Sequence, residues 1–356
     1  MTARRVLQAL AGLAISAGAL WLTLRGKDLG AIWAAMRAGD YRYLVPYFAI
    51  LLAIHVVRTV RWGLLLRPLS ALPFARLNAV AAVGFMALVV LPFRLGEFAR
   101  PVLIADGRKL RTSAALSSVV VERAADGLFT GLLLVVALLA LPDRTPGIRV
   151  LRVGGLLVTA AFAAVLAFLA FAYRNRARAV ALAGAAFRPL SPRLAERVSG
   201  MLDAFIHGLR VLPGARDVAL FFGLTAVYWS LVIWGMAILA AGFGLRLGLA
   251  EASAVLGILV VGVMIPAGPG MIGTFQGAIV VGLALFFPHD VVATRGVAYA
   301  NVLWAAQLIQ LTALGLPFLL SSHVQRGRLL GAGAEVGEGL ESEEAEYQAA
   351  GDDGSR

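Results

Sequence analysis

Four stretches of this chain are apolar for long enough to cross a lipid bilayer, and this feature restricts the fold more than any other. They are residues 6–24, 151–173, 218–243 and 297–320, and each approaches or exceeds the roughly 20 residues that a spanning helix needs. Only helices and closed barrels can span a bilayer, because every backbone N–H and C=O group in the lipid must find a hydrogen-bond partner within the protein. Hydrophobic residues make up 60% of the 356 residues and charged ones only 15%, so we predict an all-α polytopic membrane protein.

Further segments complete the expected architecture. Residues 41–66 and 113–141 are predicted to form two more membrane helices, which gives about six full spans. Residues 6–24 are too long for a signal-peptide core, and Arg25-Gly26-Lys27 offers no small-residue cleavage site, so this stretch is predicted to be the first span. Two other apolar segments, 77–104 and 250–287, are interrupted by Pro and Gly.

The two interruptions share a pattern. Pro92 to Phe98 and Pro269 to Phe275 both read P-x-x-x-G-x-F. A Pro/Gly break frees backbone amides and carbonyls, and at membrane depth such a backbone persists only where protein or a water-filled cavity surrounds it. Paired interruptions in corresponding positions of two halves indicate a transport site.

The distribution of charge predicts how these segments are oriented. The net charge is +12, and residues 335–353 hold 8 of the 20 acidic residues, so the chain before residue 335 has 31 basic and 12 acidic groups. Arg-rich loops stay on the cytoplasmic side, which explains this charge without any nucleic acid. Placing 174–216 and both termini in the cytoplasm makes 77–104 a hairpin that enters from the inside and 250–287 one that enters from the outside.

The predicted fold is therefore an inverted repeat of helix, broken re-entrant hairpin and helix, with halves at about 41–141 and 218–320. The loop 25–42 runs against this orientation, because it would be outside with four basic and two acidic residues. Residues 1–330 form the membrane domain. Within it, 174–216 is predicted to contain an amphipathic helix along the cytoplasmic interface, and the acidic tail 331–356 is predicted to be disordered.

The first polar cluster surrounds the first break and contains Arg94, Glu97 and Arg100. If a helix resumes after Pro92, both arginines lie one turn from Glu97, so the acid is flanked by two guanidiniums. Ionic side chains inside a membrane cost roughly 3 kcal/mol or more and mark candidate substrate pathways. The structural alternative is that this triplet caps a hairpin at the cytoplasmic interface.

The second cluster is Glu122-Arg123-Ala124-Ala125-Asp126. Glu122 and Asp126 share a helix face, where two carboxylates repel unless one is protonated or a cation approaches from elsewhere. Arg58 and Arg61, one turn apart on the predicted helix 41–66, are candidates for that cation. The cluster is then either a coupling network or a structural ion-pair staple between helices.

The third cluster is the second break, which carries no formal charge. Its polar resources are backbone groups freed around Pro269, Gly270 and Gly273, the Thr274 hydroxyl and the Gln276 amide. Such a turn, with the positive end of the helix that follows it, can hold a phosphate or carboxylate. The structural alternative is close packing by small residues.

Other chemistry finds little support in the sequence. The chain has no Cys, and its four His are scattered without a metal-binding spacing. It contains no ATP-binding loop, so a gradient or mass action would have to drive any transport. We expect no cofactor, no metal site and no catalytic constellation.

Three of these motifs, taken in order, resemble a known family. Gly96-Glu97-x-x-Arg100, Glu122-Arg123-x-x-Asp126 and Pro269-Gly270-x-x-Gly273 are similar to the transmembrane, flippase-like domain of the lysylphosphatidylglycerol synthase family, over most of 41–320. The resemblance implies an inverted-repeat helical domain that moves lipids between leaflets, with aminoacylated phospholipids handled by its best-known members. The soluble synthase domain is not expected after residue 320.

Two departures from the family pattern concern the second break. The family more often has Pro-Gly-Gly-x-Gly followed three residues later by an acid. Here Met271 replaces the middle glycine, and Gln276 stands in the acid's place. This difference weakens the case for a contact between Gln276 and a cationic substrate.

These observations predict a lipid transporter of a bacterial cytoplasmic membrane that passes a headgroup between the two broken hairpins. The expected substrate is an anionic or aminoacylated phospholipid, or a lipid-linked intermediate. In this hypothesis Arg94 and Arg100 contact phosphate, Glu97 orients them or carries a proton, and 269–276 forms the opposite half of the site. One alternative is an intramembrane transferase with Glu97 or Asp126 as general base. The other is a scaffold that binds an envelope-synthesis enzyme through 174–216.

Overall fold

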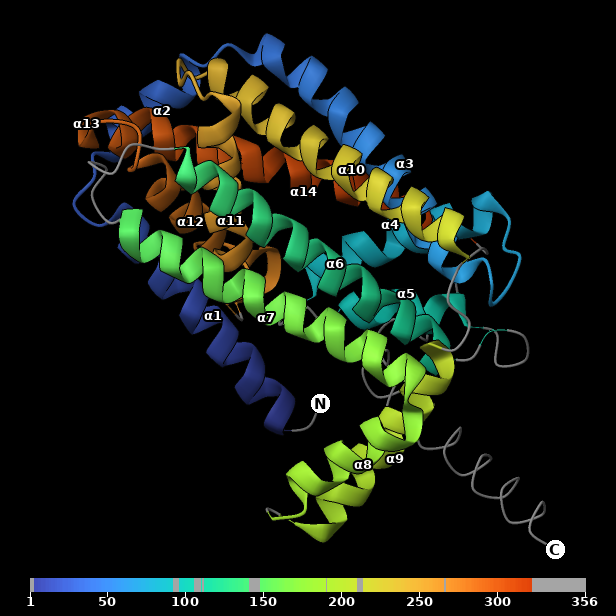
Figure 1. Cartoon of the computed structure of the whole chain (residues 1–356). Helices are drawn as coiled ribbons and strands as arrows, with labels where there is room; N and C mark the ends of the chain where they lie inside the picture. The colour runs from blue at the N-terminus through green and yellow to red at the C-terminus, as the bar shows by residue number, and fades with distance from the viewer. Residues whose placement is uncertain are drawn as a thin grey trace, which may run out of the picture.

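The computed structural model describes residues 3–91, 96–105, 110, 112–140, 148–189, 191–209, 214–265 and 267–321. Within these ranges every regular element is a helix, and most are long rods lying side by side in one bundle (Figure 1). The prediction of an all-α membrane protein is confirmed.

The N-terminal part contains a short helix within the segment 25–42, which was predicted to be a loop. Between α1 (Ala3–Leu24) and α3 (Leu44–Leu66) lie a short helix, α2 (Leu29–Arg37), and a 3₁₀ turn, η1 (Tyr41–Tyr43). Asp28 caps α2 by accepting a hydrogen bond from the amide of Ala31 at 3.1 Å, which satisfies one of the amides left unpaired at a helix start. The segment 25–42 is therefore largely helical.

The next helices divide into two groups that repeat the same order. After α3 come α4 (Phe74–Val90), α5 (Ala99–Ile104) and α6 (Thr112–Leu139). After α10 (Ala215–Ala241) come α11 (Leu249–Gly262), the 3₁₀ turn η3 (Pro269–Met271), α12 (Thr274–Leu283), α13 (His289–Val291), the π turn η4 (Val292–Gly296) and α14 (Val297–Leu320). Each group thus has a long helix, two short helices separated by a break, and another long helix.

Both broken segments fold back on themselves. At 1.5 Å per residue, α4 is roughly 26 Å long and α11 roughly 21 Å, shorter than a bilayer core of about 30 Å. Arg76, near the start of α4, donates from Nη2 to the carbonyl of Ile104 at the end of α5, at 3.0 Å. In the other hairpin, Gly282 of α12 packs so closely that a Cβ there would lie 3.1 Å from Val255 of α11.

The two hairpins start from opposite ends of a central helix pair. α3 and α10 are antiparallel, because Arg67 lies 3.4 Å from Asp217 at one end, while the Asp40 amide donates to the Gly242 carbonyl at the other, at 2.8 Å. A linker of seven residues joins each helix to its hairpin. Residues 67–73 follow α3, and residues 242–248 follow α10. The hairpin α4–α5 therefore begins where α3 ends, and α11–α12 begins at the opposite end of the bundle.

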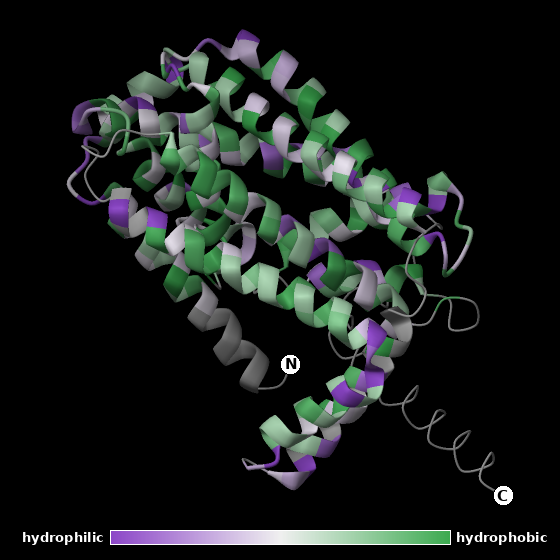
Figure 2. Ribbon diagram, in the orientation of Figure 1, coloured by the Kyte–Doolittle hydropathy of each residue, from purple (hydrophilic) through white to green (hydrophobic). Residues whose placement is uncertain are grey.

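Among the described residues, four helices are long and apolar enough to cross a membrane: Tyr41–Leu66, Arg152–Arg174, Ala215–Ala241 and His289–Leu320. Of the other predicted spans, 6–24 falls in α1, and 113–141 forms α6, which carries the charges of the second cluster. Figure 2 shows hydrophobic residues along the long helices and hydrophilic ones mostly toward the two ends of the bundle. The protein is a multi-pass membrane protein.

The predicted amphipathic segment 174–216 holds two helices where a single one was expected along the interface. α7 (Ile148–Arg174) is followed by α8 (Arg176–Phe187) and α9 (Pro192–Leu209), which pack against each other and project from one end of the bundle (Figure 1). Pro189 falls in the turn after α8, and Pro192 occupies the first position of α9, where its fixed φ favours a helix start. Arg176 of α8 forms an ion pair with Asp203 of α9.

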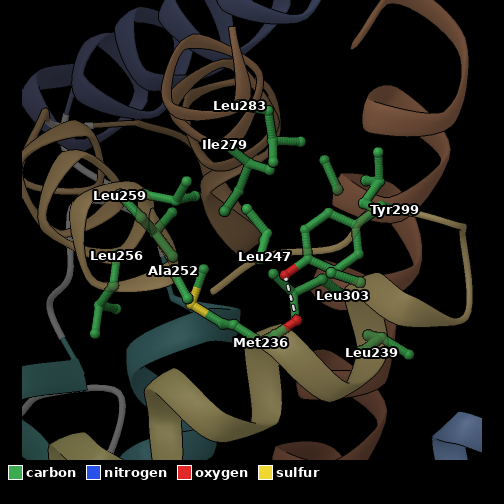
Figure 3. Packing of buried hydrophobic residues seen from close by; sticks show 14 of the residues in the cluster. Met236, Leu239, Leu247, Ala252, Leu256, Leu259, Ile279, Leu283, Tyr299 and Leu303 are labelled. Atoms are coloured by element: carbon green, nitrogen blue, oxygen red, sulfur yellow. Dashed lines mark hydrogen bonds between the residues drawn. The ribbon is translucent and has the colours of Figure 1, made fainter. Parts of the chain in front are cut away.

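The largest apolar core joins α10, α11, α12 and α14 and holds the second hairpin in place. Figure 3 shows Met236, Leu256, Ile279 and Leu303 converging from these four helices. The buried Tyr299 hydroxyl donates to the carbonyl of Met236 at 3.0 Å, so the one polar atom of this side chain is satisfied inside an apolar cluster.

Candidate functional site

An arginine on α3 neutralises the two carboxylates of α6. Arg61 donates from Nη2 to Glu122 at 2.9 Å and contacts both carboxylate oxygens of Asp126, at 2.5 and 3.0 Å. The Arg61 and Glu122 side chains are fully buried, and Asp126 is 8% exposed. The cation that the Glu122/Asp126 spacing requires therefore comes from the helix 41–66, through Arg61.

Other groups complete this ion network. Arg100 on α5 donates to the second oxygen of Glu122 at 2.8 Å, and Arg123 donates to Glu122 at 3.0 Å. From α10, the Trp229 indole donates to Asp126 at 3.3 Å, and the Thr225 hydroxyl accepts from Arg61 at 3.2 Å. The network thus connects α3, α5, α6 and α10, and it joins the two groups of helices.

Each ion in this network depends on the others. Taking a charge out of water costs several kcal/mol, and only well-placed partners recover that cost. Glu122 accepts from three guanidiniums, which makes it the centre of the network. Arg100 also stacks on aromatic rings, with its guanidinium carbon 4.8 Å from the ring centroid of Phe85 and 5.2 Å from that of Trp62.

A cavity of about 460 Å³ lies beside the network. Both hairpins contribute to its wall, through Glu97 at the first break and through Met271 and Phe275 at the second. Within the described ranges, its four charged lining residues come from α3, α6 and the first break, whereas α10, α11 and α12 supply apolar and aromatic side chains. The charged residues are Arg58, Glu97, Arg123 and Asp126. A volume of this size lies within the usual range of small-molecule sites.

Arg58 occupies a different position from Arg61, although the two lie one helical turn apart. It lines the cavity, and its guanidinium carbon is 3.6 Å from the ring centroid of Phe85 and 5.6 Å from that of Tyr228. Its buried Nε has no hydrogen-bond partner among the described residues. Arg58 is held by aromatic faces and not by a carboxylate within the described ranges.

The first break is described only in part. Gly96 and Glu97 lie in the structure, whereas Arg94 falls outside the described residues. A Cβ on Gly96 would lie 2.1 Å from the amide nitrogen of Leu88, so only glycine allows the chain to fold back against α4 here. Glu97 faces the cavity, while Arg100 is buried against Glu122. The structure therefore separates two residues that the sequence analysis placed on one binding surface.

The second break satisfies many of its polar groups internally. Gln276 accepts from the Gly273 amide at 2.8 Å and so caps α12, and the Thr274 hydroxyl donates to the Met271 carbonyl at 3.0 Å. Trp304 donates to the carbonyl of Gly270 at 2.7 Å. Gly270 and Gly273 have φ of 73° and 86°, values that favour glycine. The structure places Thr274 and Gln276 in the first turn of α12, shortly after the turn that starts at Pro269 and Gly270, with Met271 and Phe275 in the cavity wall.

α1 lies directly on this second break. The Gly268 amide donates to Ser16 Oγ at 2.9 Å, and a Cβ on Gly273 would be 2.5 Å from the amide nitrogen of Leu20. The small residues therefore serve close packing with α1 as well as the turn itself, which was the structural alternative for this segment.

We expect Gly273→Ala to lower the free energy of unfolding by about 2–3 kcal/mol, because alanine disfavours this backbone conformation and its Cβ would overlap the α1 backbone. The measurement is an SDS unfolding titration in mixed micelles. Gly223→Ala in α10 is the matched control, since no heavy atom of the described residues beyond its own stretch of helix backbone lies within 4 Å of its Cβ position, and we expect no loss there. Equal midpoints for the two variants would contradict this packing.

Several residues of the cavity were not predicted from the sequence. Gln307 and Gln310 line it from α14, and Gln307 donates to the Tyr47 hydroxyl at 3.1 Å. Trp229 and Thr225 contact the ion network. The two glutamines, three residues apart in the apolar run 297–320, were the available signal, because polar side chains within a membrane helix usually face the protein interior.

Comparison with known proteins gives one match that covers most of the chain. The family model described as the lysylphosphatidylglycerol synthase TM region matches residues 9–320. No curated protein matches the chain. The matched region contains the ion network, the cavity and both hairpins.

Proposed function

The chain belongs to the lysylphosphatidylglycerol synthase transmembrane family, and from this premise we propose that it moves a lipid headgroup between leaflets of a bacterial cytoplasmic membrane. The family relates it to lipid metabolism or transport. The single observation that carries the specific proposal is the cavity, whose lining combines charged residues with apolar and aromatic ones and which is bounded by both broken hairpins. A headgroup would occupy the cavity while its acyl chains remain in the lipid.

The packing of the helices supports an inverted repeat. α3 packs on α10, α4 on α14 and α6 on α11. In the repeat, α3 corresponds to α10, α4 to α11 and α6 to α14. If the two groups are exchanged, the contact between α4 and α14 becomes the contact between α11 and α6, and the contact between α3 and α10 is unchanged. Because α3 and α10 are antiparallel, the axis that relates the groups runs across the helices. An axis in the membrane plane is the arrangement of inverted-repeat transporters, whose substrate sites lie between the repeats.

The structure also supports a division of roles among the predicted site residues. Arg61 and Arg100 both donate to Glu122 and connect the helices, so we assign these three residues to holding the cavity wall. Arg100, which the sequence analysis placed on a phosphate, belongs to this group. Glu97 and Arg58 face the cavity, so we assign them to the headgroup pathway.

We propose transport without a chemical step. Both carboxylate oxygens of Asp126 already accept hydrogen bonds, from Arg61 and Trp229, whereas a general base needs a free oxygen within hydrogen-bond reach of the proton that it abstracts. Formation of a modified lipid by the purified protein, detected by mass spectrometry, would instead favour the transferase.

The proposed orientation predicts which linker is reachable from each side of the membrane. Cysteine replacements for Ala71 and Arg246, both exposed, mark the two seven-residue linkers, and the chain has no cysteine of its own. We expect a membrane-impermeant maleimide to label Arg246→Cys in intact cells and Ala71→Cys only after the membrane is opened. Labelling of both positions from one side would exclude opposed hairpins.

The direct test of the function is leaflet exchange in proteoliposomes. Purified protein is reconstituted with lipids that carry a fluorophore on one acyl chain, and dithionite reduces the fluorophore in the outer leaflet. We expect the protected inner-leaflet fraction to fall with time in the presence of the protein. Exchange no faster than in protein-free liposomes, for phosphatidylglycerol, phosphatidylethanolamine and lysyl-phosphatidylglycerol alike, would reject the proposal.

A further inference from the structure

Three residues that line the cavity carry hydrogen-bond donors that have no acceptor among the described residues. Arg58 Nε, Arg123 Nε and Gln310 Nε2 are buried and have no acceptor among the described residues, and all three residues line the cavity. Guanidinium groups offer donors only, and the unsatisfied atom of Gln310 is also a donor. A buried donor without a partner costs about 1–3 kcal/mol, and the polar part of the lining is thus rich in donors, which suits a ligand rich in acceptor oxygens.

The formal charge of the same region has the matching sign. Within the described ranges, the ion network and the charged cavity wall together contain four arginines and three carboxylates, which leaves one excess positive charge. These residues are Arg58, Arg61, Arg100, Arg123, Glu97, Glu122 and Asp126. An excess charge is expensive inside a membrane and by default marks a substrate pathway.

Arg58 is the best-placed cation to meet a ligand. Its guanidinium lies against the face of Phe85 and near Tyr228, and stacking of this kind leaves the in-plane N–H groups free to donate. A planar donor fork suits the oxygens of a phosphate. Arg61 and Arg100 differ because their N–H groups already contact Glu122.

We propose that the cavity selects lipids whose headgroup carries a net negative charge, with the phosphate seated at Arg58. This inference rests on the proposed function and names its substrate class: a phosphodiester or phosphomonoester without a balancing amine. A zwitterionic headgroup neutralises its own phosphate, and a cationic aminoacyl headgroup adds positive charge to a region that already carries an excess.

The test measures binding separately from transport. Purified protein in neutral detergent is titrated with phosphatidylglycerol, phosphatidylethanolamine, lysyl-phosphatidylglycerol or inorganic phosphate, and the concentration giving half of the maximal rise in unfolding temperature is recorded. We expect phosphatidylglycerol to act at a concentration at least tenfold below the other three. Arg58→Gln should raise its value about tenfold, as expected for losing a charge-assisted hydrogen bond of ~1.4 kcal/mol, and Arg58→Lys should recover part of the difference.

Arg67→Gln is the matched control, because Arg67 lies just beyond the C-terminal end of α3 and its side chain is 69% exposed. We expect its phosphatidylglycerol value to equal that of the unchanged protein. Equal values for the three phospholipids, or an unchanged preference in Arg58→Gln, would overturn anionic selection even if leaflet exchange occurs. A response to inorganic phosphate alone would overturn the lipid assignment. An Arg58-dependent preference without leaflet exchange would support the anion seat and reject the proposed transport.

Discussion

Replacing Arg61 by methionine is expected to lower the free energy of unfolding by roughly 3–5 kcal/mol, the usual cost of removing one partner from a buried ion pair. The loss would leave Glu122 and Asp126 buried with Arg100 and Arg123 as their remaining cations. Methionine fills a similar volume, so the effect reports the missing charge and not a cavity. The measurement is an SDS unfolding titration in mixed micelles.

Two other positions on the same stretch of chain serve as controls. Arg67→Met removes an exposed pair with Asp217, 3.4 Å long, and surface pairs contribute about 0–1 kcal/mol. Arg58→Met removes a guanidinium that has no carboxylate partner among the described residues, so it should leave stability unchanged or raise it. A loss at Arg58 as large as that at Arg61 would contradict the distinction between a structural and a ligand-facing arginine.

The second large effect is expected from Val260→Trp, which should reduce leaflet exchange to the rate of protein-free liposomes. Val260 is half-buried on α11 and lines the cavity near the second break. The much larger indole would fill space that a headgroup must enter. Exchange is measured with the dithionite assay, and the unfolding midpoint of each variant is recorded to confirm that it is folded.

The neighbouring residue provides a matched control. Val261 is 42% exposed and lies outside the cavity wall, so Val261→Trp places the same side chain on the other face of α11. Tryptophan on an exposed face of a membrane helix is well tolerated. We expect transport close to that of the unchanged protein. Equal exchange in the two variants would show that lipid does not pass through this cavity.

The sequence predicted the helices and their interruptions well, for a physical reason. Long apolar runs form helices because lipid leaves the backbone few alternatives, and 41–66, 218–243 and 297–320 differ by a few residues from the helices in the structure. Pro92, Pro269 and the nearby glycines marked both breaks, because proline and glycine disrupt helices by their own chemistry. The repeated order of elements followed from the spacing of these signals.

The sequence was a poorer guide to which polar side chains contact one another. Arg58 and Arg61 were equivalent candidates for Glu122 and Asp126, and only the packing of α3 against α6 and α10 decided in favour of Arg61. Arg100 was placed with Glu97 because they are one turn apart, but the contact with Glu122 on another helix prevailed. Gln276 was considered as a ligand, although its side chain caps its own helix. These outcomes depend on long-range geometry, which spacing along the chain does not encode.

The contact of α1 with the second hairpin has a thermodynamic consequence. α1 packs on α12 and η3, where Ser16 accepts a hydrogen bond from the Gly268 amide, and α1 lies outside both groups of helices in the proposed repeat. Exchange of those groups therefore does not regenerate the same molecule. Two conformations related by such an exchange must differ in free energy. We expect one of them to dominate at rest, so that a substrate gradient acts on a biased equilibrium.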